Sequence, residues 1–153
     1  MWVPPEDIDP VVLHAPTRKS VAFFGAVRSS DGLLVTQRNE KFNAETFLAF
    51  LARLIRRKRQ GRKMFVVVDN ARWHHAKALL PWLGQHKKSL RLDFLPPYSP
   101  ALNHIERVWK LTRRLCTHNE YFETLEEVIG AVKSQFQLWN KPNATLHRLC
   151  AII

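Results

Sequence analysis

The chain has 153 residues, of which 46% are hydrophobic and only 5 are Gly, a composition typical of one globular domain with a core of its own. Lys and Arg number 24 against 13 Asp and Glu, so the formal net charge is +11; this favours a polyanionic partner, DNA above all, without separating specific from non-specific binding. No apolar stretch approaches the length of a membrane span, so we expect a cytoplasmic protein with no membrane partner.

The first part of the chain is rich in proline, and residues 1–16 are predicted to form an irregular lead-in. Ser20 to Arg28 is apolar on both alternating faces and predicts a strand. The run Ser29-Ser30-Asp31-Gly32 predicts a hairpin turn, with Asp31 as a turn residue, and Leu33 to Gln37 is the returning strand.

A helix is predicted after Asn43, which caps it with Thr46 at the position usually held by Glu. Phe47, Phe50 and Leu54 recur at helical spacing and form its packing side. The end of this helix and the residues after it are very basic. Cations there complement the helix dipole, but their number exceeds what capping requires, so phosphate contact is favoured over a solvated face. The predicted DNA contacts of this run are Arg56, Arg57, Arg59, Arg62 and Lys63.

Met64 to Val68 is an uncharged, valine-rich run that predicts a buried strand, and the turn dipeptide Asp69-Asn70 follows it. The strand delivers the Asp69 carboxylate to its C-terminal end, where open α/β sheets build their sites. The residues from His74 to Lys77 are predicted to begin a helix, with Pro81 in its first turns. His74, His75 and Lys77 are candidate phosphate contacts, although surface histidines at a helix start explain the two rings equally well.

Leu90 to Leu95 predicts a further strand, in which Asp93 faces solvent or a basic neighbour. The segment Pro96-Pro97-Tyr98-Ser99-Pro100 follows, and its prolines fix the backbone and hold the turn stiff. This turn is either an ordinary rigid loop or a device that pre-positions the next carboxylate and forms a channel wall for DNA, with Tyr98 as a DNA contact.

A helix predicted from Leu102 carries an apolar stripe, and Glu106 falls at the margin of this stripe at about 100° per residue. Glu106 can then be half-buried while Lys110 and Arg113 reach towards phosphates. The alternative is a Glu106–Lys110 surface pair, worth only a few tenths of a kcal/mol. Thr124 caps the last long helix, and residues 144–153 predict a short final one.

Asp69 and Glu106, once the fold brings them together, suit Mg²⁺ or Mn²⁺, because these hard cations prefer carboxylate oxygens. Two such ions activate a water and stabilise a leaving oxygen in phosphodiester chemistry. Zinc is not expected, because Cys116-Thr117-His118 has no second ligand pair at finger-like spacing. Cys116 and Cys150 lack a CxxC spacing and are expected to be reduced thiols.

Residues 67–77 and 95–110 together resemble the catalytic domain of mariner-type transposases, in the branch of the bacterial insertion sequences within the DDE superfamily of endonucleases. Thirty-six residues separate Asp69 from Glu106, which fits the gap between the second and third carboxylates of that family. The resemblance covers residues 1–153 as a single catalytic domain. One departure is His104, which stands where the family usually has Pro.

The resemblance implies an α/β, ribonuclease-H-like (retroviral-integrase-like) sheet with flanking helices. It also implies DNA transposition, in which metal-activated water cuts the element's ends and the freed 3′-hydroxyl attacks target DNA. Asp69 and Glu106 would be the catalytic metal ligands. The family's first strand, with its Asp, is expected to be missing before Trp2. The third carboxylate would then come from upstream sequence or another polypeptide, with a small chance for Glu6, Asp7 or Asp9.

A missing central strand would leave two unpaired sheet edges, which a homodimer or a complementing transposase chain could fill. Two other functions stay open. The missing Asp favours a non-catalytic, basic DNA-binding or oligomerising remnant of a transposase. A cellular ribonuclease-H-like nuclease for junctions or RNA hybrids is disfavoured by the pattern of prolines before Glu106.

Overall fold

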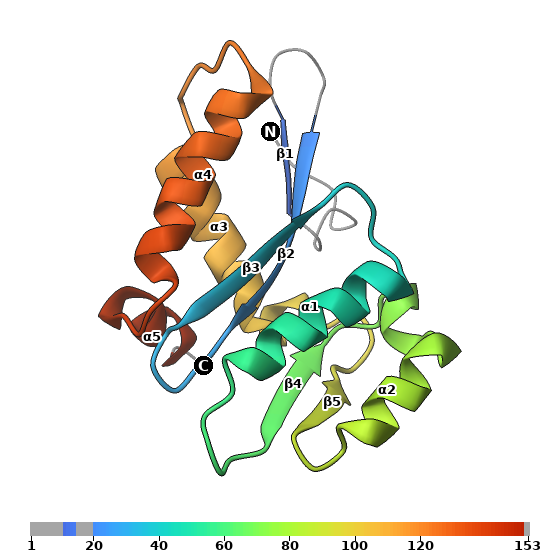
Figure 1. Ribbon diagram of the computed structural model, residues 1–153. Helices are drawn as coiled ribbons and strands as arrows, with labels where there is room; N and C mark the ends of the chain where they lie inside the picture. The colour runs from blue at the N-terminus through green and yellow to red at the C-terminus, as the bar shows by residue number, and fades with distance from the viewer. Residues whose placement is uncertain (1–10, 15–19, 152–153) are drawn as a thin grey trace. The chain divides into compact units, whose positions relative to one another are not determined.

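The computed structural model describes residues 11–14 and 20–151, and the chain divides into two compact units (Figure 1). Residues 1–40 and 104–153 form the first, here named the terminal unit. Residues 41–103 form the second, here named the central unit. The central unit is one continuous stretch of chain, whereas the terminal unit is assembled from the two stretches on either side of it.

The terminal unit contains an antiparallel sheet in the order β1-β2-β3, with β1 at Val11–His14, β2 at Ser20–Val27 and β3 at Leu34–Asn39. The predicted hairpin between β2 and β3 is confirmed. Asp31 binds the Arg28 guanidinium at 2.6 Å, and its Oδ1 accepts from the backbone N–H of Leu33 at 3.2 Å. Gly32 has φ +78°, a left-handed conformation that favours glycine, so Asp31 is a turn residue as expected.

The strand β1 corrects the prediction of an irregular lead-in over residues 1–16, because residues 11–14 pair with β2. That prediction rested on the prolines on either side of these four residues. Flanking prolines do not exclude a strand, because a short strand needs only its own N–H and C=O groups to be available. The other expectations for this lead-in, including Glu6, Asp7 and Asp9, lie outside the described residues.

The described residues of the terminal unit also form three helices: α3 at His104–Cys116, α4 at Leu125–Trp139 and α5 at Ala144–Ala151. Trp109 of α3 and Phe136 of α4 reach the same face of β2. The Phe136 ring meets Phe23 edge-on at 5.2 Å, and a Cβ at Gly25 would collide with the Trp109 ring. Gly25 therefore lets α3 approach the sheet closely. The core consists of Val21, Phe23, Leu34, Ile105, Val108, Trp109, Cys116, Val128, Ile129, Val132, Phe136, Trp139 and Leu146.

The central unit begins with α1 at Ala44–Arg56 and contains the parallel pair β4 at Met64–Val68 and β5 at Leu90–Phe94 (Figure 1). Asn43 and Thr46 form the predicted capping box at the start of α1, with both hydrogen bonds present. Val68 pairs with Phe94, and the Leu95 N–H donates to the Val68 carbonyl at 2.8 Å. Because the strands are parallel, Asp69 and Leu95 follow them at the same edge.

The segment between β4 and β5 differs from the single helix predicted from His74. It forms two 3₁₀ turns, η2 at Arg72–His75 and η3 at Lys77–Leu79, and only then the short helix α2 at Leu80–Gln85. Pro81 lies at the start of α2, where its missing N–H costs no intrahelical hydrogen bond. A further 3₁₀ turn, η4 at Pro100–Leu102, precedes α3. Among the described helices, none is long and apolar enough to cross a membrane.

Candidate active site

Asp69 follows the last residue of β4, and its carboxylate is fixed by two neighbours in the next turn. Its Oδ1 accepts from the backbone N–H of Ala71 at 2.9 Å, which closes an Asx turn. The Nδ1 atom of His74 lies 2.9 Å from the same Oδ1 and 3.0 Å from the Asp69 carbonyl oxygen. The side chain of Asp69 is 30% exposed, so the carboxylate is held firmly while solvent still reaches it.

His74 is buried, not at the surface as a DNA-contacting or helix-start histidine was expected to be. Its residue is 6% exposed, and its ring packs on Phe47 of α1 with centroids 4.5 Å apart. A carbonyl oxygen only accepts, so the contact to the Asp69 carbonyl requires that His74 carries a proton on Nδ1. The donor of His74 therefore points back into the protein, towards Asp69.

His75 and Asn70 form a second contact beside the first. The Asn70 amide Nδ2 donates to the Leu95 carbonyl at 2.9 Å, which ties the ends of the two parallel strands together. Its Oδ1 then faces the Nε2 atom of His75 at 3.0 Å. The His75 ring is stacked on Phe94, with centroids 4.3 Å apart and planes 13° from parallel. The role of Asn70 was not predicted from the sequence, although an amide directly after a strand-end Asp is a signal for such a contact.

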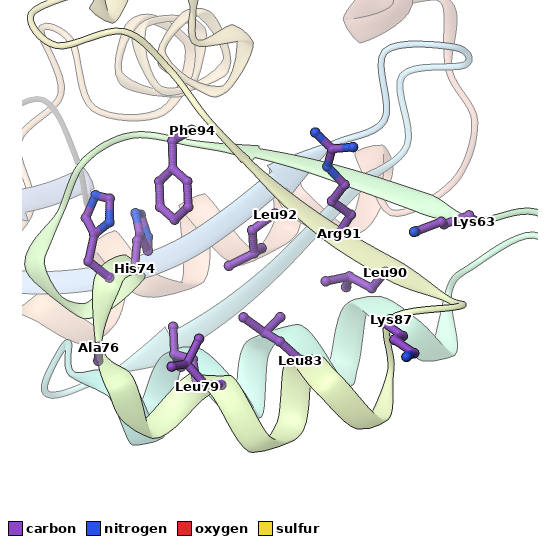
Figure 2. Close-up of a pocket in the computed structure, with 12 residues that line it drawn as sticks. Lys63, His74, Ala76, Leu79, Leu83, Lys87, Leu90, Arg91, Leu92 and Phe94 are labelled. Atoms are coloured by element: carbon purple, nitrogen blue, oxygen red, sulfur yellow. The ribbon is translucent and has the colours of Figure 1, made fainter.

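A pocket of about 420 Å³ lies beside these histidines, entirely within the central unit (Figure 2). Leu79 and Leu83 point from the helical segment towards Leu90 and Leu92 of β5. His74 and Phe94 lie at one end, and Lys63 and Lys87 at the other (Figure 2). The pocket thus gives the histidine rings an apolar neighbourhood, and the cations stand away from them.

Glu106 belongs to the terminal unit, in the first turn of α3. Its residue is 9% exposed, which does not fit the solvent-exposed Glu106–Lys110 pair that the sequence left open. A carboxylate in the first turn of a helix is stabilised by the helix dipole. Next to it, burial and the positive charge of Arg107 lower the pKa of His104, the residue that stands in place of the family's Pro.

In the part of the chain that the structure describes, no three His, Cys, Asp or Glu side chains are grouped so as to hold a metal ion. Asp69 and Glu106 lie in different units. Their oxygens are hard donors, the type that Mg²⁺ and Mn²⁺ select.

Most of the predicted DNA contacts have exposed side chains. In the central unit the exposed ones are Arg56, Arg59, Arg62, Lys63, His75, Lys77 and Tyr98, while Arg57 is partly covered. In the terminal unit Lys110 is exposed and Arg113 is partly covered. Tyr98 is fully exposed and has φ +57°, a strained conformation for a bulky residue that costs about 1–3 kcal/mol and is commonest at functional sites.

The positive charge is divided very unequally between the two units. The central unit holds 13 Lys and Arg against 3 Asp and Glu, a net charge of +10. The terminal unit holds 11 Lys and Arg against 10 Asp and Glu, a net charge of +1. Nearly the whole excess of cations therefore lies in the unit that carries Asp69.

The sequence pattern of the DDE superfamily endonucleases matches residues 2–129 of the chain. The chain belongs to this family. The resemblance drawn from residues 67–77 and 95–110 is thereby confirmed, and the match takes in both Asp69 and Glu106.

The chain is similar to the 39 kDa protein of insertion element IS630 from Shigella sonnei. The two are 27% identical over 109 residues, which cover 71% of this chain and 32% of that protein. The chain thus spans about a third of the length of this relative.

Solved structures of a mariner transposase share the fold. The catalytic domain of Mos1 superposes with a TM-score of 0.68 at 20% identity, over 93% of this chain and 72% of that one. The Mos1 paired-end complex with the left transposon end gives 0.63 at 21% identity, over 98% of this chain and 45% of that one. These similarities confirm the predicted ribonuclease-H-like fold.

Proposed function

We propose that this chain is the catalytic domain of a DNA transposase, which cleaves DNA strands and transfers them in a metal-dependent reaction. The observation that carries the proposal is the position of Asp69 and the way in which its carboxylate is held. Asp69 lies at the C-terminal end of β4 with its carboxylate held by Ala71 and His74, and thirty-six residues separate it from Glu106 within the region matched by the DDE family. The similarity to the IS630 protein supports the same function.

We assign Asp69 and Glu106 as the catalytic carboxylates and as ligands of Mg²⁺ or Mn²⁺. When bound, such ions activate a water molecule and stabilise the leaving oxygen of a phosphodiester. The chain's own contribution is to hold its carboxylates in place: the Ala71 N–H and the His74 ring fix Asp69, and the first turn of α3 carries Glu106. Holding ligands before the metal arrives reduces the cost of organising them on binding.

The proposed partner is DNA, both the element's ends and the target. Mos1 is known in complex with a transposon end. In this chain, the net charge of +10 on the central unit supports contact with a polyanion. We propose that the exposed cations of the central unit, together with Tyr98, Lys110 and Arg113, contact the phosphate backbone. Such a chain would act in the cytoplasm, at the nucleoid.

We further propose that residues 1–153 act as one catalytic domain and that a third carboxylate is supplied by another transposase segment, in a homodimer or from a complementing chain. Mixing the chain with such a partner tests this directly. Activity that appears only in the mixture supports complementation, and full activity of the chain by itself contradicts it.

The experiment that tests the proposal is Mn²⁺-dependent nicking of supercoiled plasmid by the purified chain, alone and mixed with the partner that supplies the third carboxylate, beside the Asp69→Asn and Glu106→Gln variants. Nicking that both substitutions abolish supports the proposed site. A second candidate, a non-catalytic DNA-binding remnant, is favoured by the charge of the central unit. It predicts no nicking, with or without the partner chain, but a salt-sensitive gel shift that both substitutions leave unchanged.

A further inference from the structure

We propose that His74 and His75 are positioning residues, which hold the Asp69–Asn70 dipeptide through opposite ring nitrogens. His74 acts through Nδ1 on Asp69, and His75 acts through Nε2 on Asn70. This inference deepens the proposed function, since the importance of Asp69 rests on that function. It also replaces the sequence-based interpretation of the two rings as phosphate contacts.

His74 is committed to Asp69 by its surroundings. The residue is 6% exposed, and its ring packs on Phe47 at 4.5 Å and meets the Trp73 ring nearly at right angles at 5.8 Å. Trp73 in turn is stacked on Phe42 at 5.9 Å. With the ring fixed on these faces, the Nδ1–H has one direction to point, and both oxygens within reach belong to Asp69.

The two contacts of His74 Nδ1 have different consequences. The bond to the Asp69 carbonyl fixes the tautomer, because a carbonyl oxygen cannot donate. The short contact of Nδ1 with Oδ1, together with the hydrogen bond from the Ala71 N–H to the same atom, fixes the carboxylate rotamer. With Oδ1 held from two sides, the direction of the second carboxylate oxygen is set before any metal binds. Residues that contact a metal ligand commonly orient it in this way.

His75 acts one residue further on. The orientation of the Asn70 amide is set by Nδ2 donating to the Leu95 carbonyl, so Oδ1 is the acceptor and His75 must donate from Nε2. Stacking on Phe94 holds the ring parallel to that side chain. The end of β4 is therefore pinned to the end of β5 at Asn70, while the preceding residue presents its carboxylate.

The use of opposite nitrogens gives a reciprocal test. The amide nitrogen of Asn lies the same number of bonds from Cα as Nδ1 of His, and that of Gln the same number as Nε2. His74→Asn should therefore keep the donor to Asp69, and His74→Gln should lose it. For His75 the order reverses: His75→Gln should keep the donor to Asn70, and His75→Asn should lose it. His118→Gln, at an exposed position of the terminal unit, is the matched control.

The readouts are the ¹³C resonance of the Asp69 carboxyl carbon, the Asn70 side-chain amide resonances, and the Mn²⁺ concentration that broadens the Asp69 signal. We expect His74→Gln to shift the Asp69 resonance and to raise the required Mn²⁺ about tenfold, while His74→Asn stays closer to the unsubstituted chain. His75→Asn should move the Asn70 resonances more than His75→Gln does. Equal effects of Asn and Gln, or the reverse order, overturn the proposal.

A measurement on the unsubstituted chain covers the case in which His74→Gln does not fold. Two-bond ¹⁵N–¹H correlation spectra of the neutral rings should show His74 protonated on Nδ1 and His75 on Nε2. His74 protonated on Nε2 alone overturns the proposal. One outcome separates this inference from the proposed function. If no variant shows Mn²⁺ broadening or nicking, but Asn and Gln still have opposite effects at positions 74 and 75, the proposed catalytic function is contradicted and the positioning roles of His74 and His75 are supported.

Discussion

The two units of this chain differ in net charge and in how their side chains are packed. The terminal unit is nearly neutral at +1, and thirteen of the residues whose burial the structure describes pack into one core there, with Trp109 fully buried. The central unit carries +10, and Phe65 and Val67 of β4 are more than half exposed. Each unit supplies one of the two proposed catalytic carboxylates. Stability and polyanion affinity should thus respond to substitutions in different parts of the sequence.

The largest effect is expected when either carboxylate is neutralised. Asp69→Asn or Glu106→Gln should lower Mn²⁺-dependent nicking at least about a hundredfold, because metal-assisted catalysis is worth several kcal/mol. Asn at position 69 still offers Oδ1 to Ala71 and His74, so its free energy of unfolding should stay within about 1 kcal/mol of the unsubstituted chain. Undiminished nicking by either variant would contradict the catalytic role of that carboxylate and of the unit that carries it.

The next largest effect concerns the core of the terminal unit. Trp109→Ala should lower the free energy of unfolding by about 3–5 kcal/mol, since a fully buried ring leaves a cavity. Phe65→Ala in the central unit is the matched aromatic control, and with 57% of that residue exposed it should cost much less. Urea denaturation measures both. If Phe65→Ala lowered the free energy of unfolding more than Trp109→Ala does, the terminal unit would not hold the main stabilising core.

A third prediction compares the removal of three positive charges from the central unit with the removal of three from the terminal unit. Replacing Arg56, Arg59 and Arg62 by Ala should weaken DNA binding and flatten its dependence on salt, by about 0.9 in the log–log slope for each phosphate that is no longer neutralised. Replacing Lys133, Lys141 and Arg148 by Ala removes the same charge from exposed positions of the terminal unit. Gel shifts over a salt series should show little change of slope for this second set. Equal slopes for the two triple variants would mean that only the total charge matters.

The smallest effect is a pH dependence from the terminal unit. Burial raises the pKa of the Cys116 and Cys150 thiols, an effect that Arg107 partly offsets at Cys150. The folded chain therefore holds these protons more tightly than the unfolded chain does. Stability is retained below the unfolded thiol pKa of about 8.5 and falls as pH rises above it. Urea denaturation at pH 7 and pH 10 measures the loss of unfolding free energy between the two pH values. This loss should be smaller in the double variant Cys116→Ala/Cys150→Ala than in the unsubstituted chain.

Local patterns predicted local structure well. Asp31, Asn43 and Thr124 were assigned to a turn and two helix caps, and the structure confirms all three. Each depends on partners within a few residues, which a sequence pattern displays directly. For the same reason the end of β4 at Val68, and hence the place of Asp69, was predicted correctly.

Features that depend on distant partners were missed. The burial of His74 is provided by Phe47, which lies on another helix and has no sequence signal linking the two. Asn70 owes its role to the Leu95 carbonyl, which is brought close only by the parallel pairing of β4 and β5. The uneven charge was equally hidden, because the boundary of the central unit follows from packing and not from any change of composition. Helical spacing likewise overstated the helix after His74, where tertiary contacts favour two 3₁₀ turns.

The terminal unit is assembled from stretches that flank the central unit, and this arrangement fixes an order of events during synthesis. The central unit is complete in sequence once residue 103 has left the ribosome. The hairpin of β2 and β3 emerges earlier, but it waits for α3 and α4 to cover the face that carries Phe23 and Gly25. A nascent chain therefore passes through a stage in which the basic unit is whole and an apolar sheet face is open, the stage at which chaperone capture or premature contact with DNA is most favoured.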